Sequence, residues 1–376
     1  MKIPMLDLKG QYQKIKKDID SSIQNVVDNT NFINGPDVHL FEKNIGDYLG
    51  SKHVIACANG TDALQIALMA LGLKPGDEVI VPAFTYAATA EVVGLLGMVP
   101  VLVDVDENNF NIKIEDIEPS ITEKTKAIVP VHLFGQAAQM EQIMEIAARH
   151  NLFVIEDNAQ ALGATYRYSN GTVKSLGTIG DIGCTSFFPT KNLGCYGDGG
   201  AIFTQSQKLA DRVRMVTDHG QKIKYYHDII GCNSRLDSIQ AAILNVKLAQ
   251  LDNYSKLRYQ AASIYRELLS GIDGITLPVE VDYSTHVYHQ FTIRLADKRD
   301  ELKLFLANKG IASMTYYPLS LNNQKAFSTI SEIRVSLSNS EKLASQVLSL
   351  PMHTELTREV QEIICSAIKE YFDEQN

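Results

Sequence analysis

The feature that most constrains this 376-residue chain is the alternation of short apolar segments with helical segments through its first half. The apolar segments lack the polar alternation of a half-exposed strand, which indicates strands buried on both faces. The strands predicted here are residues 53–57, 78–82, 99–105, 127–132 and 152–155, and the intervening helices are residues 63–71, 85–96, 114–121 and 137–150. We therefore expect an α/β fold, with a large domain built on a mostly parallel sheet that helices cover.

The rest of the chain extends this domain and adds a smaller one. The further elements predicted for the large domain are helices at residues 12–27, 38–49 and 208–216 and strands at 183–187 and 201–204. A long helical pattern at residues 236–269 predicts the connection to a small α+β domain. The elements predicted there are strands at 288–295, at 312–317 and near Leu348, and helices at 302–309 and 358–372. We expect a large domain at residues 1–250 and a small C-terminal domain at 251–376.

Composition and charge argue against several classes of protein. The net charge of −9 and the lack of a basic run disfavour a nucleic-acid partner. The five cysteines are dispersed without CxxC or zinc-ligand spacing, so we expect reduced thiols and no metal site. The most apolar segment, residues 92–103, is short and broken by Gly94, Gly97 and Pro100, which disfavours a membrane span. The first residues also lack the apolar region of a signal peptide, and we expect a cytoplasmic protein.

Ligand-binding residues are expected directly after the strands, because ligands of a parallel sheet bind beyond the carboxyl ends of its strands. Gly60 and Thr61 follow the first strand and begin a helix, whose free N–H groups and positive dipole end suit a phosphate. Asp157 follows the strand at 152–155, where its carboxylate would face a ligand. The ordinary alternative for Asp157 is a helix cap or a loop carboxylate.

Lys191 ends a dense motif, Ser186-Phe187-Phe188-Pro189-Thr190-Lys191, which several glycines follow. Taken alone, such a lysine is more often a solvated surface residue. Together with Asp157 and a phosphate site at the same sheet edge, it instead indicates a site for pyridoxal 5'-phosphate (PLP). The lysine would form a Schiff base with the cofactor, and the carboxylate would keep the pyridine nitrogen protonated. A dinucleotide-binding oxidoreductase is disfavoured, because no GxGxxG motif follows the first strand.

Several short motifs in a fixed order resemble the DegT–StrS family of sugar-nucleotide aminotransferases, PLP-dependent enzymes of fold type I. The motifs are Phe32-Ile33-Asn34-Gly35-Pro36 with Phe41-Glu42, Asn59-Gly60-Thr61-Asp62-Ala63-Leu64, Pro82-Ala83-Phe84-Thr85-Tyr86, Pro130-Val131-His132-Leu133-Phe134-Gly135, Glu156-Asp157-Asn158-Ala159-Gln160, the Lys191 motif, and Gly231-Cys232-Asn233-Ser234-Arg235-Leu236-Asp237 with Gln240-Ala241-Ala242. Each motif is weak alone, but together they cover essentially the whole chain.

The resemblance implies a role for each matching position. Lys191 matches the lysine that holds the cofactor and moves a proton between the substrate carbon and C4′ of the cofactor, and Asp157 matches the partner of the pyridine nitrogen. The remaining cofactor-binding positions implied are Gln160 beside the phenolic oxygen, Tyr86 stacked on the ring, and Gly60, Thr61 and Ser186 at the phosphate. Asn233 matches a residue that reaches the phosphate from the neighbouring subunit, which implies a homodimer with shared active sites.

The resemblance also implies the reaction, which is transfer of an amino group from L-glutamate to a nucleotide-linked keto sugar. Arg235 is a candidate for an anionic substrate group, because its guanidinium suits carboxylate or phosphate, although a salt bridge at the rim is an equal alternative. Tyr317 is the second substrate candidate. It lies in Tyr317-Pro318-Leu319-Ser320-Leu321-Asn322, which departs from the family's Tyr-Pro-x-Pro-Leu-His near the sugar.

The surroundings of Lys191 are similar to those of relatives that aminate 3-keto sugars, and most similar to the aminotransferases for UDP-2-acetamido-2-deoxy-3-keto-uronates. The implied product is an amino sugar for a surface polysaccharide or lipopolysaccharide. A dTDP-3-keto-6-deoxyhexose or a 4-keto sugar nucleotide is the alternative substrate. Two other classes stay open. Sugar C3-dehydratases resemble this group but carry histidine at the position of Lys191, and a regulator would bind PLP without catalysis.

Overall fold

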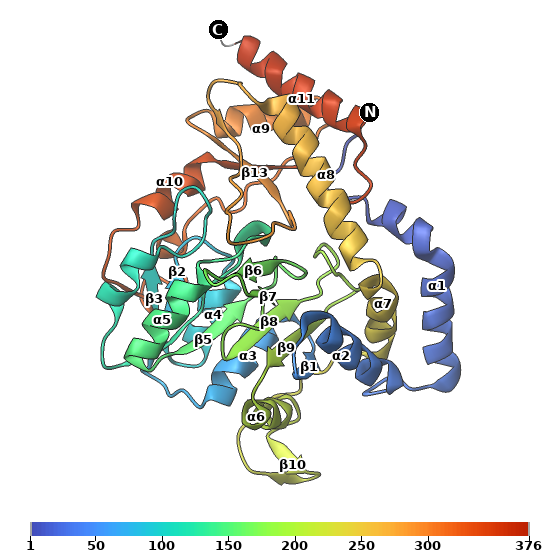
Figure 1. The fold of residues 1–376 in the computed structure, drawn as a ribbon, viewed down its shortest axis with the longest axis vertical. Helices are drawn as coiled ribbons and strands as arrows, with labels where there is room; N and C mark the ends of the chain where they lie inside the picture. Colours follow the sequence, from blue (N-terminus) through green and yellow to red (C-terminus); the bar gives the residue numbers. More distant parts are fainter. Residues whose placement is uncertain (1, 375–376) are drawn as a thin grey trace.

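The structure, a computed structural model, describes residues 2–374. Its main sheet has eight strands in the order β1-β9-β8-β5-β4-β2-β3-β14 (Figure 1). These strands are β1 (His53–Cys57), β2 (Glu78–Pro82), β3 (Val99–Val103), β4 (Thr125–Ile128), β5 (Phe153–Asp157), β8 (Ile182–Ser186), β9 (Gly200–Thr204) and β14 (Glu332–Ile333). Every neighbouring pair from β8 to β14 is parallel, whereas β9 runs antiparallel to both β8 and β1. The predicted α/β fold with a mostly parallel sheet is confirmed.

Helices cover both faces of this sheet. One face packs against α3 (Gly60–Leu71), α4 (Ala88–Leu95) and α6 (Gln207–Thr217). The other face packs against α2 (Pro36–Leu49), α5 (Met140–His150) and α7 (Ser238–Leu248), and α1 (Leu8–Asn29) lies outside α7. In β1, Ile55 and Cys57 join the first core and Val54 and Ala56 the second, as the two-residue period of a strand requires. Burial on both faces explains why the strands read as continuous apolar segments.

Four sequence-based predictions about individual elements are wrong. Residues 114–121 form two short 3-10 turns, η1 (Ile114–Asp116) and η2 (Glu118–Ser120), because proline at position 119 cannot sit in a helix interior. The strand predicted at 127–132 ends at Ile128, two residues before Pro130, which has no N–H to donate. The helix predicted at 236–269 is interrupted, since α7 ends at Leu248 and α8 (Leu251–Leu269) follows. Residues 312–317 form no named strand, and Met314 makes only an isolated bridge with Ser349.

The C-terminal part of the chain builds a second, smaller sheet. Its strands are β12 (Ile275–Thr276), β13 (Phe291–Leu295) and β15 (Val347–Leu350), all antiparallel to their neighbours. The helices α8, α9 (Arg299–Asn308) and α11 (Arg358–Asp373) pack against it around one apolar core. Figure 1 shows these elements together at one end of the molecule, next to both termini.

One C-terminal segment returns to the main sheet. β14 pairs with β3, and the neighbouring Arg334 contacts the buried carboxylate of Glu78 at 2.7 Å. Leu321, Phe327 and Leu337 belong to the core under α3 and α4. Residues after position 251 therefore contribute to the main sheet and its core as well as to the smaller sheet. The domain division at residues 250 and 251 stays a prediction.

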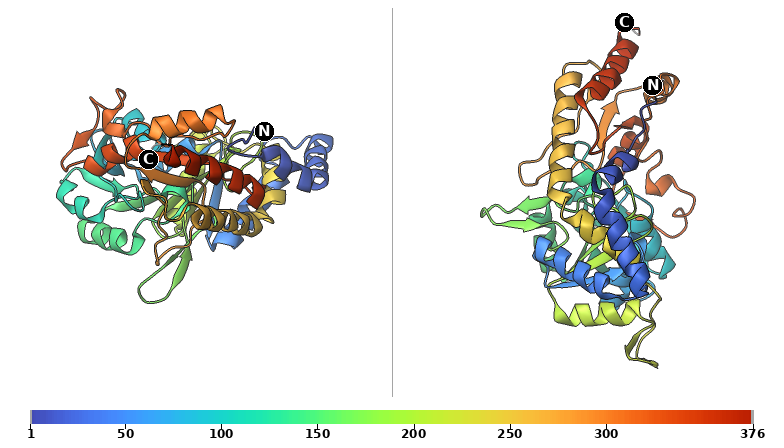
Figure 2. Two further views of the ribbon diagram at one scale, coloured as in Figure 1. Left: turned by 90° about the horizontal axis from the view of Figure 1, so that it is seen from above. Right: turned by 90° about the vertical axis from the view of Figure 1, so that its right-hand side faces the viewer.

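A hairpin of β10 (Gln221–Ile223) and β11 (Tyr226–His227) projects from the end of the molecule opposite α11 (Figure 1 and the right-hand view of Figure 2). Its apolar side chains face solvent, with Ile223 66% and Tyr225 77% exposed. No helix among residues 2–374 is both long and apolar enough to cross a membrane. The chain also forms a second hairpin, β6 (Thr165–Arg167) with β7 (Val173–Ser175), and the helix α10 (Ser338–Gln346).

Candidate active site

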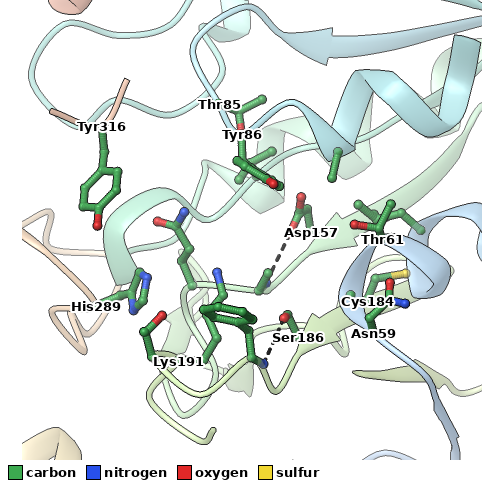
Figure 3. Close-up of a pocket in the computed structure, with 18 of the residues that line it drawn as sticks. Asn59, Thr61, Thr85, Tyr86, Asp157, Cys184, Ser186, Lys191, His289 and Tyr316 are labelled. Atoms are coloured by element: carbon green, nitrogen blue, oxygen red, sulfur yellow. Dashed lines mark hydrogen bonds between the residues drawn. The ribbon is translucent and has the colours of Figure 1, made fainter. Parts of the chain in front are cut away.

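A cavity of about 540 Å³ opens beyond the carboxyl ends of β5 and β8 (Figure 3). The predicted site residues that line it are Gly60, Thr61, Tyr86, Asp157, Gln160, Ser186, Lys191 and Tyr317. They come from segments spread over more than half of the sequence, and the parallel sheet brings them to one edge.

Asp157 is the last residue of β5 and is 6% exposed. The Thr89 hydroxyl of α4 donates to Asp157 Oδ2 at 2.9 Å. The backbone N–H of Ala159 donates to Oδ1 at 3.2 Å. These two bonds hold both oxygens of the carboxylate in place. In Figure 3 the carboxylate lies below the ring of Tyr86, and both side chains border the cavity.

Lys191 lies in a turn after β8, and its backbone N–H donates to the Phe188 carbonyl at 2.8 Å. The turn is tight, because a Cβ at Gly194 would lie 2.5 Å from the Pro189 carbonyl oxygen. Its side chain lines the cavity, and burial lowers the pKa of the Lys191 amine to about 8, although the charge of Asp157 acts in the opposite direction. With this pKa, about one tenth of the amine is the nucleophilic free base at pH 7.

The opposite end of the cavity lies at the first turn of α3, where the helix N-terminus suits an anion. Asn59 caps this helix by accepting the Asp62 N–H at 2.8 Å, which leaves the N–H groups of Gly60 and Thr61 to face the cavity. A Cβ at Gly60 would lie 2.6 Å from Ser186 Cβ, so only glycine allows this close approach. The hydroxyls of Thr61 and Ser186 add two side-chain donors.

Gln160 and Tyr317 form one hydrogen-bonded unit in the cavity wall. Gln160 Oε1 accepts the Phe134 N–H at 2.8 Å, and Gln160 Nε2 donates to the Tyr317 hydroxyl at 3.1 Å. Burial raises the pKa of Tyr317, so its hydroxyl stays protonated. Its ring lies 6.2 Å from that of Tyr86. Both polar groups are thus held in place for a ligand that reaches this wall.

The residues present fit PLP. The first turn of α3 suits its phosphate, the Tyr86 ring and the Asp157 carboxylate suit its pyridine ring, and Lys191 offers the amine that its aldehyde requires. Thr85 lines the same cavity, and its buried hydroxyl oxygen has no hydrogen-bond partner within residues 2–374. A buried hydroxyl without a partner is costly, which indicates that a ligand completes this site.

Two predicted site residues do not line the cavity. The Asn233 side chain is exposed, and its backbone bridges to Asp218. Arg235 contacts the carboxylate of Asp218 at 3.4 Å and lines a different hollow beside α2 and α6. Within a single chain, these two residues therefore cannot touch a ligand bound at Lys191.

The cavity also contains residues that the sequence did not indicate. They are chiefly Phe188, Asp198, His289, Gln290 and Tyr316. Phe188 belongs to the Lys191 motif, so its place next to the lysine in the sequence is the signal that could have identified it. Its side chain is 49% exposed. His289 comes from the segment just before β13, and nothing in its local sequence marks it.

We expect Thr89→Val to weaken PLP binding about tenfold, because a hydrogen bond to a charged group contributes roughly 1.5 kcal/mol. Titration of the cofactor-free protein with PLP measures this change. Thr204→Val is the matched control, since Thr204 is a buried threonine whose hydroxyl donates to the Asp181 carbonyl at 2.8 Å. Equal weakening by both substitutions would contradict a specific role of Thr89.

Comparison with known proteins decides the family. The model of the DegT/DnrJ/EryC1/StrS aminotransferase family matches residues 13–369. The chain belongs to this family. The predicted family and aminotransferase activity are confirmed.

Two relatives illustrate the range of names within the family. The chain is 49% identical over 374 residues to a Geobacillus stearothermophilus protein named "Pleiotropic regulatory protein", with 99% of each chain covered. It is 45% identical over 367 residues to the "UDP-2-acetamido-2-deoxy-3-oxo-D-glucuronate aminotransferase" of Pseudomonas aeruginosa, covering 97% of this chain and 99% of that one. One of these names denotes a regulator and the other an enzyme.

A solved structure supports the cofactor. NtdA from Bacillus subtilis, with bound cofactor PMP, has a TM-score of 0.90 and 33% identity, and the match covers 99% of this chain and 85% of that one. PMP is the aminated form of PLP, and PLP is the cofactor of this aminotransferase family. The PLP prediction is therefore confirmed, while the contact made by each residue stays a prediction.

Proposed function

We propose that this aminotransferase moves an amino group from L-glutamate to a UDP-linked 3-keto sugar, of the 2-acetamido-3-keto-uronate type. The observation that carries the reaction type is Lys191, which faces the cavity beside Asp157 where sugar dehydratases of this fold would carry histidine. The substrate type is supported by the motif around Lys191 and by the name of the Pseudomonas aeruginosa relative. The product would be an amino sugar for a surface polysaccharide.

Each residue of the cavity has a separate proposed role in this reaction. When bound, PLP supplies an electron sink for the bond that breaks at the amino-bearing carbon. Lys191 Nζ would hold the cofactor, then carry the proton between the substrate carbon and C4′. Asp157, fixed by Thr89, would keep the ring nitrogen protonated. The N–H groups of Gly60 and Thr61 and the Ser186 hydroxyl would hold the phosphate, and Tyr86 would cover the ring.

The charge of the cavity supports a homodimer. L-glutamate and a sugar diphosphate are anions, yet the residues that line the cavity of one described chain include one lysine and no arginine. Arg235 and Asn233 lie outside this cavity, near the exposed apolar hairpin of β10 and β11. We propose that this surface meets a second copy, so that Asn233 reaches the phosphate and Arg235 the substrate of the neighbouring active site. The ion pair of Arg235 with Asp218 is partly exposed and is therefore easily exchanged.

Mixing two inactive variants tests the shared site. Lys191→Ala and Arg235→Ala are each expected to be inactive or nearly so as homodimers. Random assortment after mixing and subunit exchange should restore about one quarter of wild-type activity, because half of the dimers are mixed and each mixed dimer has one intact site of two. Size-exclusion chromatography confirms the assembly. No recovery in demonstrably mixed dimers would contradict a contribution of Arg235 across the interface.

The regulator alternative is tested by the first half of the reaction. The PLP-loaded protein is incubated with L-glutamate, and the cofactor absorbance near about 420 nm is followed together with release of 2-oxoglutarate. We expect the absorbance to fall as 2-oxoglutarate appears in equal amount. A stable absorbance with every amino donor tried would reject the transferase proposal in favour of a non-catalytic regulator.

The sugar itself is tested with a panel of keto sugars linked to UDP, dTDP and GDP. We expect the UDP-linked 2-acetamido-3-keto-uronate to be aminated with the highest kcat/KM. A preference for a dTDP-3-keto-6-deoxyhexose or for a 4-keto sugar would replace the substrate proposal and leave the reaction type intact.

We propose a cytoplasmic location on the sequence grounds alone.

A further inference from the structure

Lys247 is a buried cation that has no part in the reaction described above. It lies near the end of α7, and only 1% of the residue is exposed. Burial lowers the pKa of its amine to about 8, so about nine tenths of the amine is protonated at pH 7. The ammonium forms no ion pair with a carboxylate within residues 2–374. Burying a charge without a counter-ion is costly, which indicates that the donors of this group have a specific use.

The contact that Lys247 makes is with the turn that carries Lys191. Lys247 Nζ donates to the backbone oxygen of Gly194 and lies 5.3 Å from the centre of the Tyr196 ring. Gln240 lies two helical turns earlier on the same face of α7, and its Oε1 accepts the Tyr196 N–H at 2.8 Å. The helix α7 therefore holds the later part of this turn at two points.

Gly194 connects this contact to the backbone next to Lys191. A Cβ added at Gly194 would lie 2.5 Å from the Pro189 oxygen and 2.7 Å from the Phe188 oxygen, so the two sides of the turn are in direct backbone contact. The Phe188 oxygen also accepts the Lys191 N–H at 2.8 Å. A continuous series of packed and hydrogen-bonded groups thus runs from Lys247 to Lys191.

We propose that Lys247 is a positioning residue for Lys191, because its hold on the Gly194 carbonyl fixes the turn from which the Lys191 side chain enters the cavity. The inference rests on the proposed role of Lys191, whose amine leaves the cofactor, carries a proton and returns. A lysine side chain is flexible, so its amine is well placed only where its backbone is fixed. A displacement of about 1 Å can slow a reaction by as much as 10²-fold. Lys247 itself does not line the cavity.

Hydrogen exchange of the cofactor-free protein tests this hold without any reaction. Lys247→Met keeps a similar side-chain volume and removes the donor. We expect residues 187–196 to exchange at least about tenfold faster in this variant, because the N–H groups of Lys191 and Cys195 both bond to backbone oxygens within the turn, at 2.8 Å. Residues of β13 should exchange as in the wild type. Unchanged exchange of the turn would overturn the proposal.

Single turnover with L-glutamate tests the consequence for Lys191 in the PLP-loaded protein. Lys247→Met should lower the rate constant about tenfold and leave the half-saturating glutamate concentration within about twofold, because Lys191 moves the proton only after the donor has bound. A merely structural role would reduce the fraction of protein that reacts and leave the rate constant unchanged. Lys247→Gln keeps a donor on a side chain one bond shorter, so its rate constant should lie between those of the wild type and the methionine variant.

Leu302→Ala is the control for lost stability, because Leu302 is fully buried in the core of the smaller sheet. It should lower the melting temperature and leave both the exchange of residues 187–196 and the rate constant unchanged. Equal slowing by Leu302→Ala and Lys247→Met would overturn the proposal, as would a wild-type rate constant in Lys247→Met. If the methionine variant does not fold, Lys247→Gln decides by the same two measurements.

The wild type distinguishes this inference from the proposed function. If the PLP-loaded wild type does not react with L-glutamate or any other amino donor, the proposed function is rejected. The exchange measurement needs no cofactor, so it still decides whether Lys247 holds the turn. A reactive wild type together with unchanged exchange in Lys247→Met would reject only the role of Lys247.

Discussion

Lys191→Ala is expected to slow amino transfer by at least about 10⁴-fold, because one substitution removes both the attachment point of the cofactor and the group that moves the proton. The two tasks fall on the same nitrogen, so no neighbouring side chain can take over either of them. The buried Lys247 donates to the Gly194 carbonyl under the turn and does not line the cavity. Single-turnover rates with L-glutamate measure the loss.

Two controls accompany this variant. Lys208→Ala removes an exposed lysine of α6 and should leave the rate unchanged. A small primary amine added to Lys191→Ala should restore part of the rate, because the missing proton carrier is an amine. An unaltered melting temperature shows that the fold is kept. A rate within tenfold of the wild type would contradict the proposed role of Lys191.

Asp157→Asn is expected to have the second largest effect, a loss of roughly 10² to 10³-fold in the rate with L-glutamate. The amide has the shape of the carboxylate but carries no negative charge, so it cannot keep the ring nitrogen protonated. Thr89 and the Ala159 N–H can still orient it. PLP binding should therefore change less than the rate does.

Asp181→Asn is the matched control for this change. Asp181 precedes β8, and its carboxylate accepts the Val154 N–H at 2.8 Å, at the end of the sheet away from the cavity. It should alter stability and leave the rate within about twofold. If both variants lose activity equally, the effect of Asp157→Asn is structural and the assigned role is wrong.

The sequence was sufficient to predict the elements whose character is set locally. The bounds of β1 and β2 agree with the predicted ranges, because a strand buried on both faces must be apolar without interruption. The same logic located the cavity. Gly60, Asp157 and Ser186 stand at the ends of such strands or just after them, and parallel strands bring those ends to one edge.

Features that depend on distant contacts were not predictable in this way. β14 is two residues long, and its place beside β3 follows from the packing of residues 321–337 and from the Arg334–Glu78 pair. The function of Arg235 depends on a second copy of the chain.

The Geobacillus stearothermophilus relative is named as a regulator, so we ask whether the cavity of this chain is built for catalysis. An aminotransferase needs a lysine amine that can lose its proton and a carboxylate held in the same cavity, and both are present here. The geometry of Lys191 and Asp157 therefore favours catalysis for this chain.

The most direct test of amino transfer follows the nitrogen atom itself. L-glutamate labelled with heavy nitrogen is incubated with the PLP-loaded protein and the UDP-linked 2-acetamido-3-keto-uronate, and the sugar product is examined by mass spectrometry and NMR. We predict that the label appears on C3 of the sugar, with one 2-oxoglutarate formed for each amino sugar. A sugar that loses a hydroxyl without gaining the label, or that returns unchanged, would contradict the account.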